Sequence, residues 1–309
     1  MGPREANEVL ARAWGLEGEL EPLPSERDRN FLVRVAGEPR FVLRFSNARE
    51  DPLVLDLQHR AAERLLAAGV PVQRIVPATD GREVVEAGGH LVRLCTYLPG
   101  RPMAEVPSRP PELLRDVGRL AGRAARALEG FEHPAASRYL HWDVRHARRV
   151  IEACAPDLSA GAARELVLRT LRRFRRETLP LLALAREGVV HGDANDHNVL
   201  VDEEGRRAVG LLDLGDLVRT YVVHDAAVAC AYAMLGQEAP LEAAAEVLAG
   251  YQEAFPFEGA EREALLGLIR IRLATSVAIA ARQHREAPDD PYLTVSAGPA
   301  LELLGRLDR

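Results

Sequence analysis

A change in residue pattern near position 100 constrains the fold of this chain more than any other feature. Before it, short apolar runs alternate in the manner of β-strands, and after it apolar residues recur at helical spacing. Between the two lies a segment, residues 99–111, with five prolines, which cannot continue a helix or a central strand. The pattern predicts a smaller, strand-rich domain over residues 1–98 and a larger, mainly helical domain over 99–309 that begins with this connector.

The expected elements follow the same division and predict an α+β fold. In the first domain, alternating runs at 31–35 and 41–45 flank a turn at 37–39 and favour a β-hairpin. A helix is expected over 53–68, with further strands near residue 75 and over 91–98. In the second domain the spacing predicts helices over 113–128, 166–182, 226–235, 241–255 and 261–282, and short strands at 189–190, 199–201 and 209–212.

Charge and composition exclude several classes of protein. The chain has 40 basic and 46 acidic residues, a net charge of −6, which argues against a duplex nucleic-acid binder. No signal peptide is evident at the start, and the apolar runs are interrupted before the roughly 20 residues of a membrane helix. Three widely spaced cysteines form no disulfide or zinc pattern. We therefore expect a cytoplasmic protein with no nucleic-acid or membrane partner, and leave the oligomeric state open.

All 40 basic residues are arginines, because the chain contains no lysine. This excludes a Walker A phosphate loop and a pyridoxal phosphate Schiff base, since both need a lysine. Coding bias is the simplest explanation of the missing lysine, since either residue serves on a solvated surface.

Two polar segments carry the chemistry. The first, HGDANDHN at 191–198, lies between two apolar runs, and the second, LLDLGD at 211–216, follows about a dozen residues later. Two carboxylates and an amide at the ends of adjacent strands suit a magnesium–phosphate site. An Asp five residues before an Asn, with a later Asp-x-Gly, is the arrangement used in kinase-type phosphoryl transfer. The spacing therefore indicates that Asp193, Asn198 and Asp213 form a kinase-type site for phosphoryl transfer.

The motifs HGDANDHNVLVD and LLDLGD resemble the aminoglycoside phosphotransferase and choline kinase superfamily. The stretches SERDRNFLVRV, FVLRFSNARE, LVRLCTYLPGRPMAEVP and FEHPA resemble its hydroxylysine kinase branch, over most of the chain from about residue 26 to 282. The resemblance implies a protein-kinase-like bilobal fold, with a small antiparallel-sheet N-lobe and a larger, mainly helical C-lobe. It assigns nucleotide-binding strands to the former, and the catalytic loop, metal site and acceptor pocket to the latter.

The resemblance also implies roles for single residues of the two motifs. Asp193 and Asn198 would be catalytic, with Asp193 accepting the proton of the substrate hydroxyl. Asn198 and Asp213 would bind Mg²⁺, and His191 would organise the loop. An Asx-type turn is the alternative interpretation of Asp193 and Asn198. Asp225 precedes an apolar run and is interpreted as a helix N-cap.

The resemblance implies that the acceptor is a small hydroxylated amine or amino acid. Carboxylates and aromatic faces would attract its ammonium group. We expect Asp196, His197, Asp216 and Tyr221 to contact it. A solvated loop is the alternative for Asp196 and His197, and Asp216 could instead bind the metal through water or brace the turn. Further acids and aromatics that could hold a cationic group are Asp225, Trp142 and Tyr292, although packing is the stronger interpretation of Trp142.

For the nucleotide, the resemblance points to the loop with Ser25, Arg29 and Asn30, to Arg44, and to main-chain groups of Thr96 and Leu98. Two positions depart from the family pattern. Arg44 stands where the family usually has a lysine, and the helix that usually supplies its glutamate partner has Gln58 there, with Glu63 as its nearest acid. An Arg44–Gln58 contact would replace the usual ion pair.

Three functions are compatible with these observations. The first is a Mg²⁺-dependent kinase that transfers phosphate from GTP or ATP to the hydroxyl of an amino acid, 5-hydroxylysine foremost. The second is a related kinase for an aminoglycoside, choline or ethanolamine, or homoserine. The third is a catalytically inactive nucleotide-binding scaffold.

Overall fold

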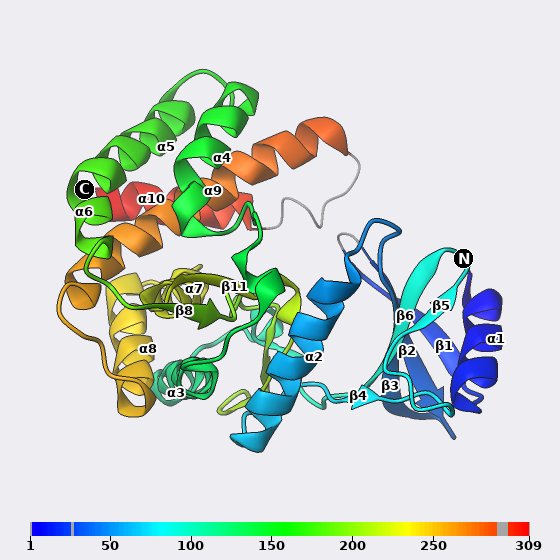
Figure 1. Cartoon of the computed structure of the whole chain (residues 1–309). Helices are drawn as coiled ribbons and strands as arrows, with labels where there is room; N and C mark the ends of the chain where they lie inside the picture. The colour runs from blue at the N-terminus through cyan, green and yellow to red at the C-terminus, as the bar shows by residue number, and fades with distance from the viewer. Residues whose placement is uncertain (1, 26–27, 289–295, 309) are drawn as a thin grey trace. The chain divides into compact units, whose positions relative to one another are not determined.

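The computed structural model describes residues 2–25, 28–288 and 296–308. The chain divides into two compact units, residues 1–99 and residues 100–309 (Figure 1). The first is built around an antiparallel sheet and the second mainly from helices, so the α+β class that the residue pattern predicts is confirmed.

The first unit is a six-stranded antiparallel sheet with two helices. The sheet has the order β1-β2-β3-β6-β4, and β5 pairs with β6. Its elements are α1 (Pro3–Trp14), β1 (Glu19–Leu23), β2 (Arg29–Val35), β3 (Glu38–Phe45), α2 (Pro52–Ala67), β4 (Ile75–Val76), β5 (Val85–Ala87) and β6 (His90–Thr96). The expected hairpin is present, with a two-residue turn at Ala36 and Gly37. Both turn residues have the positive φ that such a turn requires, 53° and 82°.

The core of the first unit lies under α1. Apolar residues of α1, among them Leu10 and Trp14, pack with Phe31 and Phe45 from the sheet, and this helix lies beside the sheet in Figure 1. The Trp14 indole Nε1 donates to the Val76 carbonyl (2.8 Å) and ties the helix to β4. The sequence analysis missed both α1 and β1.

The second unit surrounds two small sheets with helices. One sheet has the order β10-β9-β7, and the other pairs β11 with β8. The strands are β7 (Arg101–Pro102), β8 (Glu187–Val190), β9 (Val199–Val201), β10 (Ala208–Leu211) and β11 (Val218–Tyr221). The helices are α3 (Pro111–Leu128), α4 (Ala147–Cys154), α5 (Ala162–Arg173), α6 (Leu179–Leu182), α7 (Val223–Ala233), α8 (Pro240–Ala254), α9 (Glu261–Glu286) and α10 (Ala297–Asp308). The proline-rich segment thus contributes an edge strand, β7, to this unit.

Close backbone contact holds α3 against α8. A Cβ on Gly118 would lie 1.9 Å from the Val247 carbonyl oxygen, and one on Gly250 would lie 1.8 Å from the Arg115 carbonyl oxygen. Only glycine allows the two helices to approach this closely. One expected helix, 166–182, is interrupted: a π-helical turn over Phe174–Thr178 separates α5 from α6.

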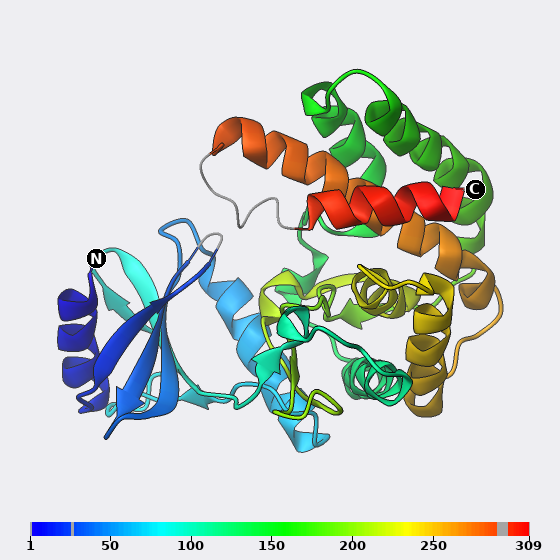
Figure 2. The same ribbon diagram turned by 180° about the vertical axis from the view of Figure 1, so that it is seen from behind.

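The longest helix, α9, runs through the second unit, and α10 lies along it (Figure 2). By length and composition alone α9 could cross a membrane, but 78% of its most apolar 18-residue window is buried inside the protein. It is packed as a core helix of this unit.

Candidate active site

Two polar segments cross between the same two small sheets of the second unit. The loop 191–198 leads from β8 to β9, and residues 212–217 lead back from β10 to β11. They touch where the Leu212 N–H donates to the Asn198 carbonyl (2.8 Å). They touch again at Gly192, which has φ of 78° and whose Cβ would lie 2.8 Å from the Asp216 carbonyl oxygen. The fold therefore brings the two motifs together.

Asp225 anchors the start of the loop from behind. Its buried carboxylate accepts from the backbone N–H groups of His191 (3.1 Å) and Gly192 (2.7 Å). Its expected role as a helix N-cap is wrong, because the cap position of α7 is Val222 and Asp225 lies inside the first turn. From there its side chain reaches loop N–H groups that would otherwise be buried without acceptors.

His191 is buried in one tautomer. Its Nδ1 accepts from the Asp193 N–H (3.2 Å), so Nε2 carries the proton and donates to the Leu212 carbonyl (3.1 Å). Burial lowers its pKa, with the Asp225 charge opposing, and the ring is neutral. These contacts tie the first motif to the second and fit the organising role expected from the sequence.

The Asp193 carboxylate is held on both oxygens. Its Oδ1 accepts from Arg272 Nη2 (2.8 Å), and its Oδ2 accepts from the side-chain amides of Asn195 (2.9 Å) and Asn198 (2.7 Å). A carboxylate has about four lone-pair sites, so three are used and one on Oδ1 stays open. With its side chain 17% exposed, Asp193 can still be reached by a small molecule.

Charges around Asp193 work in opposite directions. Burial raises the pKa of Asp193 first of all, the Arg272 guanidinium lowers it, and the negative charge of Asp213 raises it. The charge of Asp213 is therefore part of the electrostatic environment of Asp193.

Asp213 has an unusual backbone conformation. Its φ of 58° and ψ of 90° lie in a region that non-glycine residues seldom adopt. The exposed side chain caps the short 3-10 turn η6 (Leu214–Asp216), where Oδ1 accepts from the Gly215 N–H (2.9 Å). Such strain persists only where the surrounding structure holds the residue in place, and it is concentrated at functional sites.

These groups fit a divalent cation that shares its ligands with phosphates. The Asn198 amide nitrogen is used for the Asp193 carboxylate and carbonyl, and its Oδ1 takes no part in these bonds. Among the described residues no group of three or more His, Cys, Asp or Glu could hold a metal alone. Asp213 and Asn198 offer one carboxylate and one amide oxygen, and Mg²⁺ commonly completes such a partial set of oxygen ligands with water and substrate phosphates.

The residues expected to contact the acceptor are placed in different ways. Asp196 is buried, its Oδ2 bound to Arg109 (2.9 Å) and its Oδ1 without a hydrogen-bond partner. His197 is half-buried and donates its N–H to Asn195, and Asp216 is buried in η6. Tyr221 is not brought to this group. It pairs with Glu187 at the end of the β8–β11 ladder away from the loop. Tyr292 lies outside the described residues.

The sequence analysis missed the roles of Arg272 and Asn195. Arg272 comes from α9, 79 residues beyond Asp193, and its side chain is 2% exposed. The available signal was weak: Arg272 stands between Ile271 and Leu273 in a mostly apolar stretch that also contains Arg270. Asn195 lies inside the motif, but no spacing rule pointed to its contact.

In the first unit, two residues that were expected to bind the nucleotide, Asn30 and Arg44, lie in a row across the sheet with Arg93. Asn30 of β2 pairs with Arg44 of β3, which pairs with Arg93 of β6. The expected Arg44–Gln58 contact is wrong: Arg93 donates to Gln58 of α2 (2.5 Å), and Arg44 donates instead to Gln73 (2.7 Å). The contact with α2 is therefore made by Arg93 of β6, the strand next to β3.

The remaining nucleotide candidates differ in their free groups. The Thr96 N–H donates to the Arg74 carbonyl (2.8 Å) and its carbonyl accepts from Gln73 (3.1 Å), so its main chain is already engaged. The main chain of Leu98 makes no hydrogen bond to another described residue. Ser25 Oγ accepts from the Asp28 N–H (3.3 Å) and Arg29 is exposed, while residues 26 and 27 of this loop lie outside the described part.

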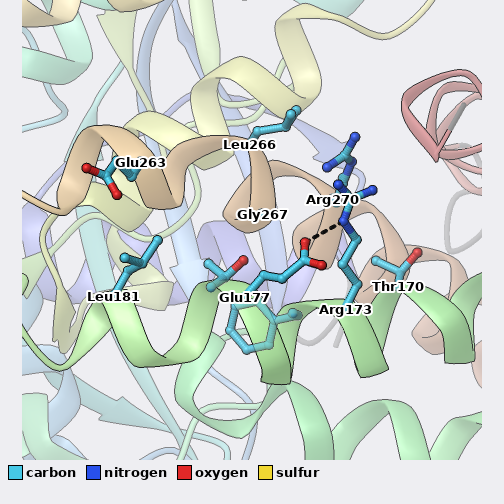
Figure 3. Close-up of a pocket in the computed structure, with 10 residues that line it drawn as sticks. Thr170, Arg173, Glu177, Leu181, Glu263, Leu266, Gly267 and Arg270 are labelled. Atoms are coloured by element: carbon cyan, nitrogen blue, oxygen red, sulfur yellow. Dashed lines mark hydrogen bonds and ion pairs between the residues drawn. The ribbon is translucent and has the colours of Figure 1, made fainter.

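A cavity of about 300 Å³ lies elsewhere in the second unit, between the α5–α6 region and α9 (Figure 3). It is lined by residues that include Arg173, Glu177 and Arg270, and Arg173 pairs with Glu177 (2.7 Å) across its wall. None of the residues of the site built around Asp193 lines this cavity, so the two are separate.

Comparison with known proteins shows the family to which the chain belongs. Residues 19–266 match the model of the phosphotransferase enzyme family. Hydroxylysine kinase from Mus musculus is 31% identical over 323 residues, which cover 95% of this chain and 85% of that protein.

Solved structures agree in fold. A microcompartment-associated aminopropanol kinase matches with a TM-score of 0.76 at 19% identity, covering 97% of this chain and 96% of that one. The amicoumacin kinase hAmiN, solved in complex with AMP-PNP, Ca²⁺ and Ami, matches with a TM-score of 0.74 at 13% identity, covering 99% of this chain and 94% of that one. The expected protein-kinase-like fold is thereby confirmed.

Proposed function

Because the chain belongs to the phosphotransferase enzyme family, we propose that it phosphorylates the hydroxyl of a hydroxylated amino acid, 5-hydroxylysine foremost, with a magnesium-bound nucleoside triphosphate as donor. Its family and relatives make it a kinase-type phosphotransferase that acts on a hydroxyl group of a small molecule. The proposal adds the acceptor, the metal and the roles of single residues.

One observation carries the proposal: Asp193, Asn198 and Asp213 stand together on two segments that cross between the same sheets. Kinase-type phosphoryl transfer needs a carboxylate for the attacking hydroxyl and oxygen ligands for the metal that bridges the phosphates. The open Oδ1 lone pair of Asp193 supplies the first, and Asp213 with Asn198 supplies the second. Bound Mg²⁺ would neutralise charge that develops on the phosphates.

In the proposed step, Asp193 orients the acceptor hydroxyl and takes its proton as the oxygen attacks the terminal phosphorus. A new O–P bond forms, the bond from that phosphorus to the leaving oxygen breaks, and the nucleoside diphosphate departs. The Asn195 and Asn198 amides hold the Asp193 carboxylate in place. Positioning of this kind supplies much of the rate in phosphoryl transfer, because the protein does little covalent chemistry.

For the acceptor, a hydroxylated amino acid is supported by the hydroxylysine kinase relatives and by the charges of the second unit. The buried Asp196 has one carboxylate oxygen without a partner, which suits an ammonium group. Arginines as well as acids lie around the site, among them Arg109 and Arg272, which suits a zwitterion better than a polycation such as an aminoglycoside.

For the donor, GTP and ATP are both retained. Arg44 and Asn30 of the first unit, with the Leu98 main chain, are the residues that we propose to contact it. Arg44 Nε and Asn30 Oδ1 are buried without hydrogen-bond partners. Buried polar groups are usually hydrogen-bonded, so we expect a bound ligand to supply their partners.

The test is an assay of diphosphate release with Mg²⁺ and either GTP or ATP. The acceptor panel contains 5-hydroxylysine, homoserine, ethanolamine, choline and kanamycin. We expect 5-hydroxylysine to give the highest kcat/KM, and Asp193→Asn to lower kcat by at least about 100-fold with nucleotide binding largely kept. Asp202→Asn, in an exposed turn of the same unit, is the control. Higher kcat/KM with kanamycin would refute the acceptor, and unchanged turnover in Asp193→Asn would refute the mechanism.

A further inference from the structure

Arg272 is a buried cation aimed at the proposed catalytic carboxylate. It lies in the middle of α9, with Ile271, Leu273 and Ala274 beside it in the core. Its Nη2 donates to Asp193 Oδ1 (2.8 Å), and its side chain is only 2% exposed.

The guanidinium lies over two aromatic rings. Its central carbon lies 4.3 Å from the centre of the Trp142 ring and 5.4 Å from that of Tyr232. The Tyr232 hydroxyl is also 3.4 Å from Nη2. Stacking on aromatic faces suits the planar guanidinium and would not suit the compact ammonium of a lysine in the same way. The two rings therefore restrict the position from which Nη2 reaches Asp193.

Stability of the core does not account for this arginine. Its Nε and Nη1 are buried without hydrogen-bond partners, an expensive state for charged N–H groups. An apolar side chain of similar volume commonly stabilises such a position at least as well as a buried ion pair. Arg272 has one hydrogen-bonded counter-ion among the described residues, and that is Asp193.

The three bonds to Asp193 explain what Arg272 can do. Asn195 and Asn198 hold Oδ2, so without Arg272 the carboxylate could still turn about its own axis and tilt Oδ1. With Nη2 fixed on Oδ1, a single lone pair of that oxygen stays open and has a defined direction.

We propose that Arg272, held by Trp142 and Tyr232, is a positioning residue that aims Asp193 Oδ1 at the acceptor hydroxyl. The proposal rests on the proposed function, in which Asp193 accepts the proton of that hydroxyl. Arg272 acts through Asp193, so its removal changes the rate of transfer and leaves nucleotide binding alone.

A double-mutant cycle tests this. Wild type, Asp193→Asn, Arg272→Gln and the double variant are compared with 5-hydroxylysine and MgGTP, or with the fastest pair of the panel above. Arg262→Gln, the same change on the exposed face of α9, is the matched control, and Arg272→Lys keeps the charge without the planar fork. Thermal unfolding confirms that each variant is folded.

We expect Arg272→Gln to lower kcat at least about 20-fold, with the nucleotide KM within about threefold of wild type. In Asp193→Asn, the added Arg272→Gln should lower kcat by less than about threefold, because a residue that acts through Asp193 has little left to position. Arg272→Lys should recover part of the loss, and Arg262→Gln should behave as wild type.

Two results would overturn the inference: kcat of Arg272→Gln within threefold of wild type, or a full second loss in the double variant. If Arg272→Gln does not fold, Arg272→Lys decides, since an unchanged kcat there would equally contradict a positioning role. Unchanged turnover in Asp193→Asn would instead refute the proposed function. The two failures are therefore distinguishable.

Discussion

At the scale of single residues, the site depends on buried charges that are matched to particular partners. Asp193 pairs with Arg272, Asp196 with Arg109, and Asp225 with two backbone N–H groups. A buried charge is tolerated only with such partners. Removal of one partner therefore lowers the stability of the protein, because the other charge stays buried without compensation.

The Asp225 anchor gives a prediction on stability. Asp225→Ala removes two charge-assisted hydrogen bonds from buried N–H groups, and we expect the free energy of unfolding to fall by about 3–5 kcal/mol. Urea unfolding measures it. The control is Asp202→Ala, because Asp202 also accepts from two backbone N–H groups, those of Arg206 and Arg207, but in an exposed turn. An equal loss in both variants would show that burial does not set the cost.

A buried histidine gives a prediction on pH. Burial and, to a lesser extent, the Arg272 charge lower the pKa of His224 to about 3. The Asp143 charge and a hydrogen bond to the Trp142 backbone oppose this shift. Since the unfolded state takes up a proton near pH 6.5 and the folded state does not, stability is lost as the pH falls below 6.5. Between pH 7.5 and 5.5 this one group accounts for about 1.4 kcal/mol.

His224→Gln should therefore lose about 1.4 kcal/mol less than wild type over that pH interval in urea unfolding. His284→Gln, on the exposed end of α9, should keep the wild-type dependence. A His224→Gln curve parallel to that of wild type would contradict the assignment.

The placement of site residues next to one another could be predicted from the sequence where the contacts are local. Asp193, Asn198 and Asp213 lie within 21 residues of one another, and strand ends place them together. Arg272 and the anchoring role of Asp225 could not be predicted, because both depend on which helix packs behind the loop. Local rules favoured a helix cap for Asp225, and a tertiary contact took precedence.

At the scale of elements, periodic helices and alternating strands were predictable, since the apolar face shows in the sequence. The hairpin at β2–β3 and the helices α2, α3, α8 and α9 are of this kind. The helices α1, α4 and α10 and the strands β1, β5, β7 and β11 were missed, and the interruption between α5 and α6 could not be foreseen. There Thr178 occupies the space beside Gly267, 1.9 Å from where its Cβ would be.

The contact of α3 with α8 gives a prediction at this scale. Gly118→Ala would place a methyl group 1.9 Å from a backbone oxygen and force the helices apart, so we expect a loss of about 3 kcal/mol in the free energy of unfolding. Gly298→Ala, in α10, meets no atom within 4 Å and should raise stability by about 0.5–1 kcal/mol through helix propensity. Thermal unfolding of both variants checks it, and a tolerated Gly118→Ala would mean that the helices can separate freely.

At the scale of the whole molecule, the division into two units followed from the change in periodicity, because each unit has to bury its own apolar faces. The absence of lysine leaves arginine as the basic residue at every position, including Arg44, Arg93, Arg109 and Arg272. Guanidinium groups stay charged when buried, which suits the number of buried cations in both units.

Ligand binding gives a prediction for the whole chain. A nucleotide that binds the folded protein raises its melting temperature according to its concentration and affinity. We expect MgGTP or MgATP to raise the melting temperature of wild type more than either nucleotide in EDTA, and Asp213→Ala to abolish that difference. Asp80→Ala, an exposed acid of the first unit, is the control. A difference that survives in Asp213→Ala would exclude Asp213 as a metal ligand.

The ladder of β8 and β11 has one more consequence. Four residue pairs, from Val218 with Val190 to Tyr221 with Glu187, fix how far each of the two polar segments extends beyond its strand. A slip of one pair would displace the segments by about 3.3 Å against each other, further than any hydrogen bond between them could stretch. We therefore expect an insertion or deletion in this short ribbon to disturb the site more than a substitution in the helices around it.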